Sequence, residues 1–361
     1  RFDVADGLMA PDSQKRHCVD CEDEMNSRIE WIDALRGIGI VLVVFGHVWR
    51  GLDGSGLIDS HAAFAAVDQS IYLFHMPFFF FLSGLLFESS IDRYGIRNSF
   101  LRRIESLIYP FLLWSYVSAF ILFSTGGMTN RGQLSLYDVL AYPWPPKDVY
   151  WFLAALFVAQ TVASLSVPLH SARIYFACFI ILSIPNLLSD FSGHDVWLQK
   201  TIQNTPFLFL GMACSKHTFS NRGLALAAFA AFFGAEIVQF FWISTQGAVH
   251  YLLSCLAAIS FAYATAWALQ RPGAGAVQAP FAALGKASMG IYVTHVIALA
   301  ATRIILSKLG VHALAVHLIL GVSAGVLGPY LFHVLAEHFR LLRPLGLGRD
   351  RRKVTENAAS T

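Results

Sequence analysis

Apolar runs long enough to cross a lipid bilayer recur along the whole of this 361-residue sequence. A transmembrane helix needs about 20 predominantly apolar residues. We predict about ten such spans, at residues 32–50, 68–87, 105–125, 149–168, 173–189, 202–215, 223–244, 249–269, 287–307 and 313–338. The sixth is the weakest, because it is short and Pro206 interrupts it. The sequence therefore predicts an all-α, polytopic integral membrane protein.

Composition excludes a water-soluble protein. Hydrophobic residues make up 56% of the chain and charged residues only 14%, against roughly 25% charged residues in an average soluble domain. Phosphate-cradling glycine loops, internal repeats and appended soluble domains are not recognisable in the sequence. The lipid bilayer is thus the expected surroundings of most of the chain.

The distribution of Lys and Arg predicts how the chain is oriented, because cytoplasmic loops carry the excess of these residues. With the amino terminus inside, about nineteen of the 26 Lys and Arg residues fall in cytoplasmic segments and about five in outer segments. Both termini are therefore expected in the cytoplasm. The net charge of +3 reflects this bias, so the basic stretch 340–353 is interpreted as a membrane-surface anchor rather than a nucleic-acid site.

Three segments are expected along the chain. Residues 1–27 are interpreted as a disordered cytoplasmic segment, with Met25 as a natural start, residues 28–340 as the membrane domain, and residues 341–361 as a basic cytoplasmic tail. Cys18 and Cys21 form one Cys-x-x-Cys pair beside His17, but a second pair at metal-site spacing is missing. No metal site is predicted.

Two ionisable residues, Arg36 and His47, lie inside the first predicted span. Ionisable groups are costly in a bilayer and usually serve a function there. Eleven residues of α-helix complete three turns plus about 20°, so both side chains share one helix face, about 16 Å apart along the axis. With the amino terminus inside, Arg36 is near the cytoplasmic end and His47 near the outer end.

This pair and several motifs further along the chain resemble those of the membrane-bound acyltransferase 3 family. They are Trp31-Ile32-Asp33-Ala34-Leu35-Arg36-Gly37, Gly46-His47, Phe74-His75-Met76-Pro77, Arg102-Arg103 ahead of Tyr109-Pro110, Tyr150-Trp151-Phe152-Leu153, and the stretch from Gly285-Lys286 to Thr294-His295. The Phe-His-Met-Pro variant most resembles the branch that contains fucose 4-O-acetylase. The resemblance covers about residues 28–340.

This resemblance implies a reaction. Members of the family transfer an acyl group, usually acetyl, from cytoplasmic acyl-CoA to a hydroxyl of an extracytoplasmic or lipid-linked carbohydrate, here at the inner membrane of a bacterium. Acetyl-CoA is then a donor substrate, and no permanently bound cofactor is expected. The family's Arg-x10-His pair maps onto Arg36 and His47. At Ser106 the sequence departs from many members, which carry a further basic residue there.

Donor binding is assigned to the arginines at the cytoplasmic boundary. Arg36, Arg102 and Arg103 are expected there, and guanidinium groups pair well with the phosphates of a CoA nucleotide. Asp33 is expected to orient Arg36. Alternatively, Arg36 simply pairs with Asp33 three residues earlier, and Arg102 and Arg103 only satisfy the positive-inside rule.

Catalysis is assigned to His47 as general base, because a neutral histidine suits proton removal near neutral pH. His75 is predicted at a similar depth on the second helix, to bind the sugar, assist proton transfer or brace the helices. Trp151 is expected to stack on a sugar ring. Ser83 keeps an acyl-enzyme route open, although its small side chain also suits helix contact. His47 and His75 have structural alternatives as buried, hydrogen-bonded histidines.

Other polar residues within the spans are interpreted as packing or pore-lining groups. They are His295, Arg303 and His317. Glu236, which also lies mid-span, needs a partner or a proton and is a further candidate for assisting the site. The phenylalanines at 78–81 and Trp144 are expected at lipid or at the membrane interface.

Two other classes of function remain open from the sequence. A transporter of a glycan or lipid intermediate would line a path with its midplane charges. A non-catalytic subunit of a polysaccharide assembly complex would tolerate loss of His47.

Overall fold

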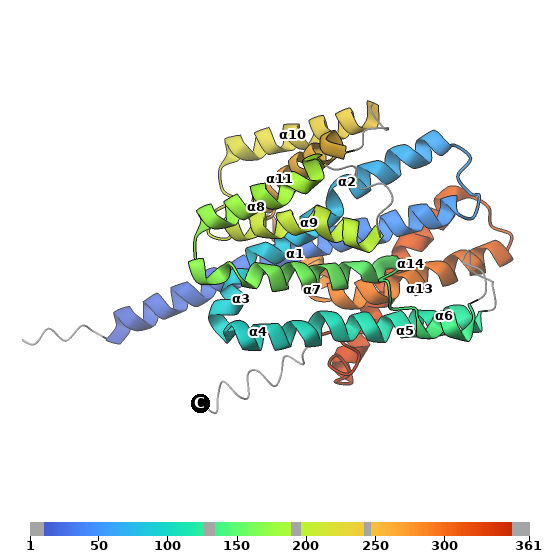
Figure 1. Cartoon of the computed structure of the whole chain (residues 1–361), viewed down its shortest axis with the longest axis horizontal. Coiled ribbons are helices and arrows are strands. Elements are labelled where there is room, and N and C mark those ends of the chain that lie inside the picture. Colours follow the sequence, from blue (N-terminus) through green and yellow to red (C-terminus); the bar gives the residue numbers. More distant parts are fainter. Residues whose placement is uncertain (1–10, 126–133, 189–195, 242–246, 349–361) are drawn as a thin grey trace, which may run out of the picture.

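The fold is a bundle of helices that run mostly along one direction (Figure 1). The computed structural model describes residues 11–125, 134–188, 196–241 and 247–348, and side chains from residue 30 onward. Every regular element in these ranges is helical. In chain order they are α1 (Pro11–Asp53), α2 (His61–Leu85), α3 (Phe87–Tyr94), α4 (Ile96–Arg103), a π-helical turn (Ile104–Ile108), α5 (Tyr109–Ser124), α6 (Leu136–Leu140), a 3-10 turn (Asp148–Tyr150), α7 (Trp151–Ser164), a second 3-10 turn (Val167–Leu169), α8 (Ala172–Leu188), α9 (Val196–Ala213), α10 (Arg222–Phe241), α11 (Gly247–Leu269), α12 (Gly275–Lys286), α13 (Ser288–Lys308) and α14 (Leu314–His338).

Eight helical stretches in the described residues are long and apolar enough to cross a membrane. They are Glu30–Asp53, His61–Tyr94, Ile96–Ser124, Asp148–Leu169, Arg222–Phe241, Gly247–Leu269, Ser288–Lys308 and Leu314–His338. The all-α polytopic architecture is thereby confirmed. The fifth and sixth predicted spans correspond to α8, a shorter apolar helix, and to α9, which packs on α2 and α8. The total of ten spans and the cytoplasmic termini stay predictions.

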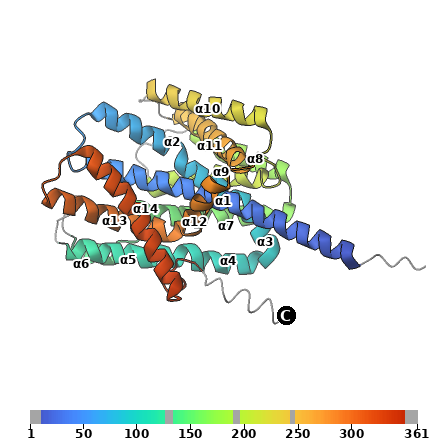
Figure 2. The ribbon, with the colours of Figure 1, turned by 180° about the vertical axis from the view of Figure 1, so that it is seen from behind.

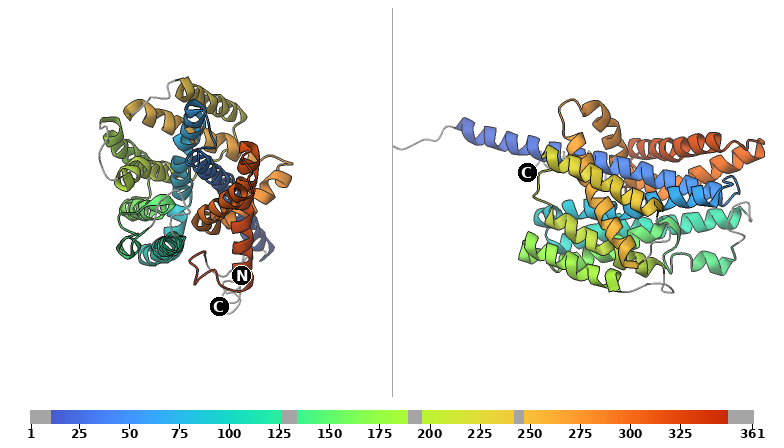
Figure 3. Two further views of the ribbon diagram at one scale, coloured as in Figure 1. Left: turned by 90° about the vertical axis from the view of Figure 1, so that its right-hand side faces the viewer. Right: turned by 90° about the horizontal axis from the view of Figure 1, so that it is seen from above.

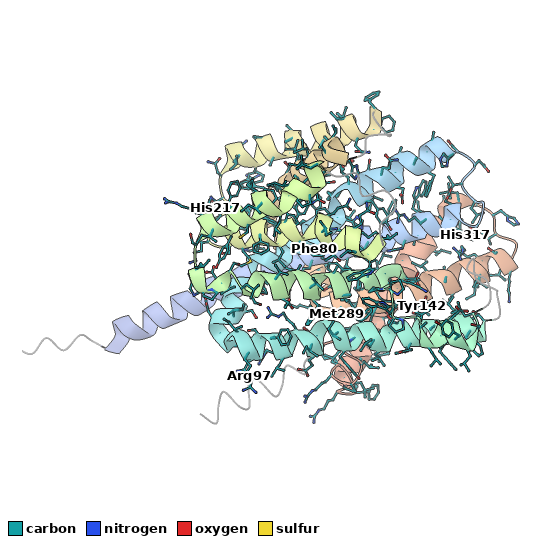
Figure 4. The ribbon with its side chains drawn as sticks, viewed as in Figure 1. Phe80, Arg97, Tyr142, His217, Met289 and His317 are labelled. Carbon is teal, nitrogen blue, oxygen red and sulfur yellow. The ribbon has the colours of Figure 1, made fainter. Side chains whose placement is uncertain are left out.

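The two ends of the bundle carry different loops. Arg97 and His217 lie toward one end, and Tyr142 and His317 toward the other (Figure 4). The first two belong to segments expected in the cytoplasm and the second two lie in or next to segments expected outside. We call these the inner end and the outer end of the bundle.

Helix α1 begins at Pro11, upstream of the span predicted from residue 32. The division of the chain into three segments stays a prediction. The side chains of Cys18 and Cys21, and the tail from residue 349 onward, lie outside the described residues.

Helix α2 occupies the centre of the bundle, where it packs against α1, α9 and α11 (Figure 3). Phe78 and Phe80 are fully buried and Phe81 is 2% exposed. The expectation that these phenylalanines face lipid is therefore wrong. Apolar side chains serve equally well against lipid and against other helices, so only the packing reveals which they contact. Trp144, in contrast, is exposed.

Helix α12 was not expected, because its residues fall in a predicted cytoplasmic loop. It packs closely on α1 through two glycines. A Cβ on Gly37 would lie 1.9 Å from the Phe281 carbonyl oxygen, and a Cβ on Gly285 would lie 1.7 Å from the Asp33 carbonyl oxygen. Small residues permit this approach of two backbones. The contact fixes the part of α1 that carries Asp33 and Arg36.

Helices α13 and α14 lie on the side of the bundle opposite α8 (Figure 3). Both pack on α1, and α14 crosses α13 obliquely (Figure 2). This arrangement brings α13 beside the outer half of α1, where His47 lies.

Candidate active site

Three histidines from three helices converge near the outer half of α1. The ring centre of His295, on α13, lies 5.2 Å from that of His47. The ring of Tyr72, on α2, lies 6.3 Å from His47 and 4.5 Å from His75. His47 and His75 thus share Tyr72 as a neighbour, as expected of residues at similar depth. His295, interpreted from the sequence as a packing or pore-lining residue, is the closest imidazole contact of His47 among these.

Exposure distinguishes the three histidines. His75 is 1% exposed and His295 is fully buried, whereas His47 is only partly buried. A group that removes a proton from a substrate must be reachable by that substrate. Of the three, His47 therefore fits that role best, and the other two are placed to support it.

Backbone carbonyls hold the two buried rings. His75 Nδ1 lies 2.7 Å from the Ile71 carbonyl oxygen, and His295 Nδ1 lies 2.7 Å from the Tyr292 carbonyl oxygen. Because a carbonyl oxygen only accepts, each Nδ1 carries a proton, which makes Nε2 the acceptor in the neutral ring. His295 Nε2 is buried and has no hydrogen-bond partner within the described part of the chain. It is therefore available to a neighbouring donor.

Two tyrosines fasten α13 to the start of α7. The Tyr150 hydroxyl donates to the Val293 carbonyl oxygen at 3.1 Å and lies 2.6 Å from the Ser118 hydroxyl on α5. The Tyr292 hydroxyl donates to the Val149 carbonyl oxygen. These bonds fix Trp151, the first residue of α7, relative to His295.

Two basic side chains lie within electrostatic reach of the histidines. Arg50, one helical turn after His47, makes a two-point ion pair with Asp68, with nitrogen to oxygen distances of 2.5 and 2.8 Å. Lys200 Nζ, on α9, lies 4.7 Å from the ring centre of Trp151. Both cations are close enough to act electrostatically on His47 and His75. The sequence placed Arg50 and Lys200 in outer segments and assigned them no role.

At the inner part of α1, Arg36 pairs with Asp33 at 3.3 Å. The side chain of Arg36 is 33% exposed and that of Asp33 is 10% exposed. This is the orienting pair expected from the sequence, and it is also the simple helix-surface pair of the alternative. The contact between α1 and α12 holds Asp33, so the guanidinium of Arg36 is held by a fixed carboxylate.

Arg102 and Arg103 face different surroundings. Arg102 stacks on the Tyr94 ring, with its guanidinium carbon 3.5 Å from the ring centre, and lines a hollow of about 420 Å³ with Arg93 and Tyr94. Arg103 is buried and donates to the Ser164 hydroxyl at 2.9 Å. A π-helical turn follows Arg103 directly. Of the two, Arg102 is the one left open to a ligand.

The remaining polar residues make local or interhelical bonds. The Ser83 hydroxyl donates to the Phe79 carbonyl oxygen on its own helix at 2.9 Å. Arg303 donates to the Gly51 carbonyl oxygen at 2.7 Å, and His317 Nε2 lies 2.8 Å from the Val311 carbonyl oxygen. Within the described residues, no group of three or more His, Cys, Asp or Glu side chains is arranged to hold a metal ion.

Most of the chain is similar to a known protein family. Residues 29–334 match the model of a family described as an acyltransferase domain. The nodulation protein NolL of Sinorhizobium fredii (strain NBRC 101917 / NGR234) is 31% identical over 178 residues, which are 45% of this chain and 40% of that protein. The nodulation protein NolL of Mesorhizobium japonicum (strain LMG 29417 / CECT 9101 / MAFF 303099) is 28% identical over 186 residues, which are 46% of each chain.

The matched part of the chain spans less than half of the length of these relatives. No solved structure matches the chain. The family match, in contrast, covers α2 to α13 entirely and most of α1 and α14, and it includes every histidine of the cluster. The chain therefore belongs to the acyltransferase 3 family and is a membrane acyltransferase.

Proposed function

We propose that this protein transfers an acyl group, most simply acetyl, from cytoplasmic acyl-CoA to a hydroxyl of a cell-surface or lipid-linked carbohydrate, in the inner (plasma) membrane of a bacterium. His47 is the general base. The observation that carries this assignment is the convergence of His47, His75 and His295, in which His47 alone is partly exposed.

The reaction balances as a direct transfer. A ring nitrogen of His47 takes the proton of the acceptor hydroxyl. At the same time, the oxygen of that hydroxyl bonds to the thioester carbonyl carbon. The tetrahedral intermediate collapses, the carbon–sulfur bond breaks, and the CoA thiolate takes the proton from His47. Ser83 is already bonded to the backbone of its own helix, which supports direct attack over an acyl-enzyme.

The positions of the charged groups support opposite routes for donor and acceptor. Arg36 precedes His47 by about three turns of α1, toward the inner end. Arg102 lines a hollow in the segment that holds Arg97, which lies toward the same end (Figure 4). If the CoA phosphates bind at this end, the pantetheine arm extends into the bundle toward His47. The carbohydrate then approaches from the outer end, past Trp151.

The relatives bear on the class of acceptor. Their name, nodulation protein NolL, connects them to nodulation, and this chain matches less than half of their length. We propose the broader class, a glycan at the cell envelope, as the acceptor of this protein.

His47→Ala tests the proposal directly. The purified protein in lipid nanodiscs is given acetyl-CoA and a glycan extract from cells that lack the gene, and release of CoA and acetylation of the glycan are measured. Loss of a general base is expected to lower turnover roughly 10²- to 10⁴-fold, with the thermal melting midpoint unchanged. His61→Ala, on an exposed residue at the start of α2, serves as control and is expected to retain full turnover.

Full activity of His47→Ala would overturn His47 as base. Wild-type protein that leaves both the donor and the glycan unchanged would overturn the proposed reaction and favour a role in transport or in assembly.

A further inference from the structure

The outer half of the active site carries an excess of positive charge. Arg50 and Lys200 both lie within electrostatic reach of His47 and His75, and Arg50 lies within reach of Lys200. Permanent charges are expensive in partly buried surroundings unless an opposite charge compensates them. The compensation of the two cations is unequal.

Arg50 has its own counterion. Its Nε and one terminal nitrogen bind the two oxygens of Asp68, and its guanidinium carbon lies 3.3 Å from the centre of the Tyr72 ring. A two-point pair of this kind uses the geometry of both groups and holds the guanidinium in place. The guanidinium of Arg50 is thus held in place, and its charge is compensated by Asp68.

Lys200 has no carboxylate in hydrogen-bond contact within the described residues. Its ammonium lies 4.7 Å from the centre of the Trp151 ring, and a second cation, Arg50, is within electrostatic reach. The contact with the indole ring offers some stabilisation, but it leaves the charge of the ammonium uncompensated. The ammonium is half-buried and has three donors to offer.

Further aromatic residues lie on the same part of the protein as Lys200. Trp197 lies three residues before Lys200 on α9, on the same helix face, and its ring centre lies 5.4 Å from that of Trp144. Trp144 is 68% exposed. Aromatic faces pack against the apolar faces of sugar rings, while an ammonium binds an anionic oxygen. Together these groups match a carbohydrate that carries a negative charge.

We propose that Lys200, beside Trp151, binds an anionic group on the carbohydrate acceptor, a phosphate or a carboxylate. The site thereby selects acidic or phosphate-linked glycans and presents their hydroxyl to His47. This inference rests on the proposed function for the identity of the acceptor, but the site itself is testable as a binding site without the reaction.

The test is a binding measurement in the absence of donor. Wild-type protein in nanodiscs of zwitterionic lipid is titrated with glucose 1-phosphate, glucuronate and methyl glucoside, and tryptophan fluorescence reports binding. The two acidic sugars are expected to bind at least tenfold more tightly than methyl glucoside, and added salt is expected to weaken them. The comparison between glucose 1-phosphate and glucuronate tells whether a phosphate or a carboxylate is preferred.

Variants locate the site. Lys200→Gln is expected to weaken the acidic sugars about tenfold and to leave methyl glucoside unchanged, whereas Lys200→Arg keeps the charge and retains most of the preference. Lys308→Gln, at an exposed lysine that ends α13 at the outer end, is the matched control and is expected to bind like the wild type.

The outcomes separate this inference from the proposed function. Equal affinity for acidic and neutral sugars, or a Lys200→Gln variant with unchanged preference, would overturn the anionic site even if acetyl transfer is intact. In a turnover assay, an equal loss of kcat with acidic and neutral acceptors would also overturn it, since it would assign Lys200 to the reacting oxyanion instead. His47→Ala is expected to retain the binding preference, because it removes only the base.

Discussion

His295 on α13 presents a buried imidazole 5.2 Å, between ring centres, from His47 on α1. Its Nδ1 is bonded to backbone carbonyls, so its Nε2 is the nitrogen left to accept a hydrogen bond. We expect a ring N–H of His47 to donate to this nitrogen, which leaves the other nitrogen of His47 as the base. We therefore infer that His295 is a positioning residue for His47.

His295→Gln is accordingly expected to slow acyl transfer without loss of donor binding. A small displacement of a catalytic group costs up to about 10²-fold in rate, so kcat is expected to fall roughly tenfold to hundredfold while the Kd for acetyl-CoA is unchanged. The pH–rate profile is expected to shift as well, because the partner of the base has changed. His338→Gln, exposed at the end of α14, is the control. An unchanged pH profile together with a lowered melting midpoint would assign His295 a structural role only.

The helices that carry the site could be predicted from the sequence, because a membrane span is recognised from its own apolar run and from the Lys and Arg residues that flank it. Arg36 and His47 could be placed on one face of one helix by arithmetic alone. The shared depth of His47 and His75 followed from the opposite directions of α1 and α2.

Pairing between distant helices could not be predicted in the same way. His295 comes beside His47 only because α13 packs on the outer half of α1, and a single sequence contains no signal for that contact. Helix α12 could not be predicted because it is short and contains Pro280. Its contact with α1 could not be predicted either, because Gly37 and Gly285 are far apart in the sequence and meet only when both helices are packed.

The crossing of α1 and α12 provides a second prediction. Gly285→Ala would bring a Cβ to 1.7 Å from the Asp33 carbonyl oxygen, so the two backbones must separate. We expect a loss of about 1–3 kcal/mol in stability, as for other overpacked sites, seen as a lower melting midpoint in detergent. Weaker binding of acetyl-CoA is expected with it, because Asp33 orients Arg36. Gly234→Ala on α10, where a Cβ would meet nothing within 4 Å, should not destabilise the protein. Equal melting midpoints for the two variants would contradict the close contact.

The two neighbouring arginines are expected to respond differently to substitution. Arg102→Ala should raise the Kd for acetyl-CoA roughly tenfold with little change in melting midpoint, because Arg102 faces the hollow beside Tyr94. Arg103→Ala should instead lower stability by about 1–3 kcal/mol, since it removes a buried donor from the Ser164 hydroxyl. Calorimetric titration with acetyl-CoA and a thermal melt distinguish the two effects. A stable Arg103→Ala variant with weakened donor binding would show that the assignment is reversed.

The tyrosine bonds between α7 and α13 provide the last prediction. Tyr292→Phe removes the hydroxyl that donates to the Val149 carbonyl oxygen and leaves that buried acceptor without this donor. A loss of about 1–3 kcal/mol in stability is expected. Because this bond also fixes the position of Trp151, the KM for the carbohydrate acceptor should rise while the Kd for acetyl-CoA stays constant. Tyr137→Phe, on the exposed helix α6, controls for the loss of a tyrosine hydroxyl. Should Tyr292→Phe leave both stability and acceptor KM unchanged, the bond between the two helices has no part in shaping the acceptor side of the site.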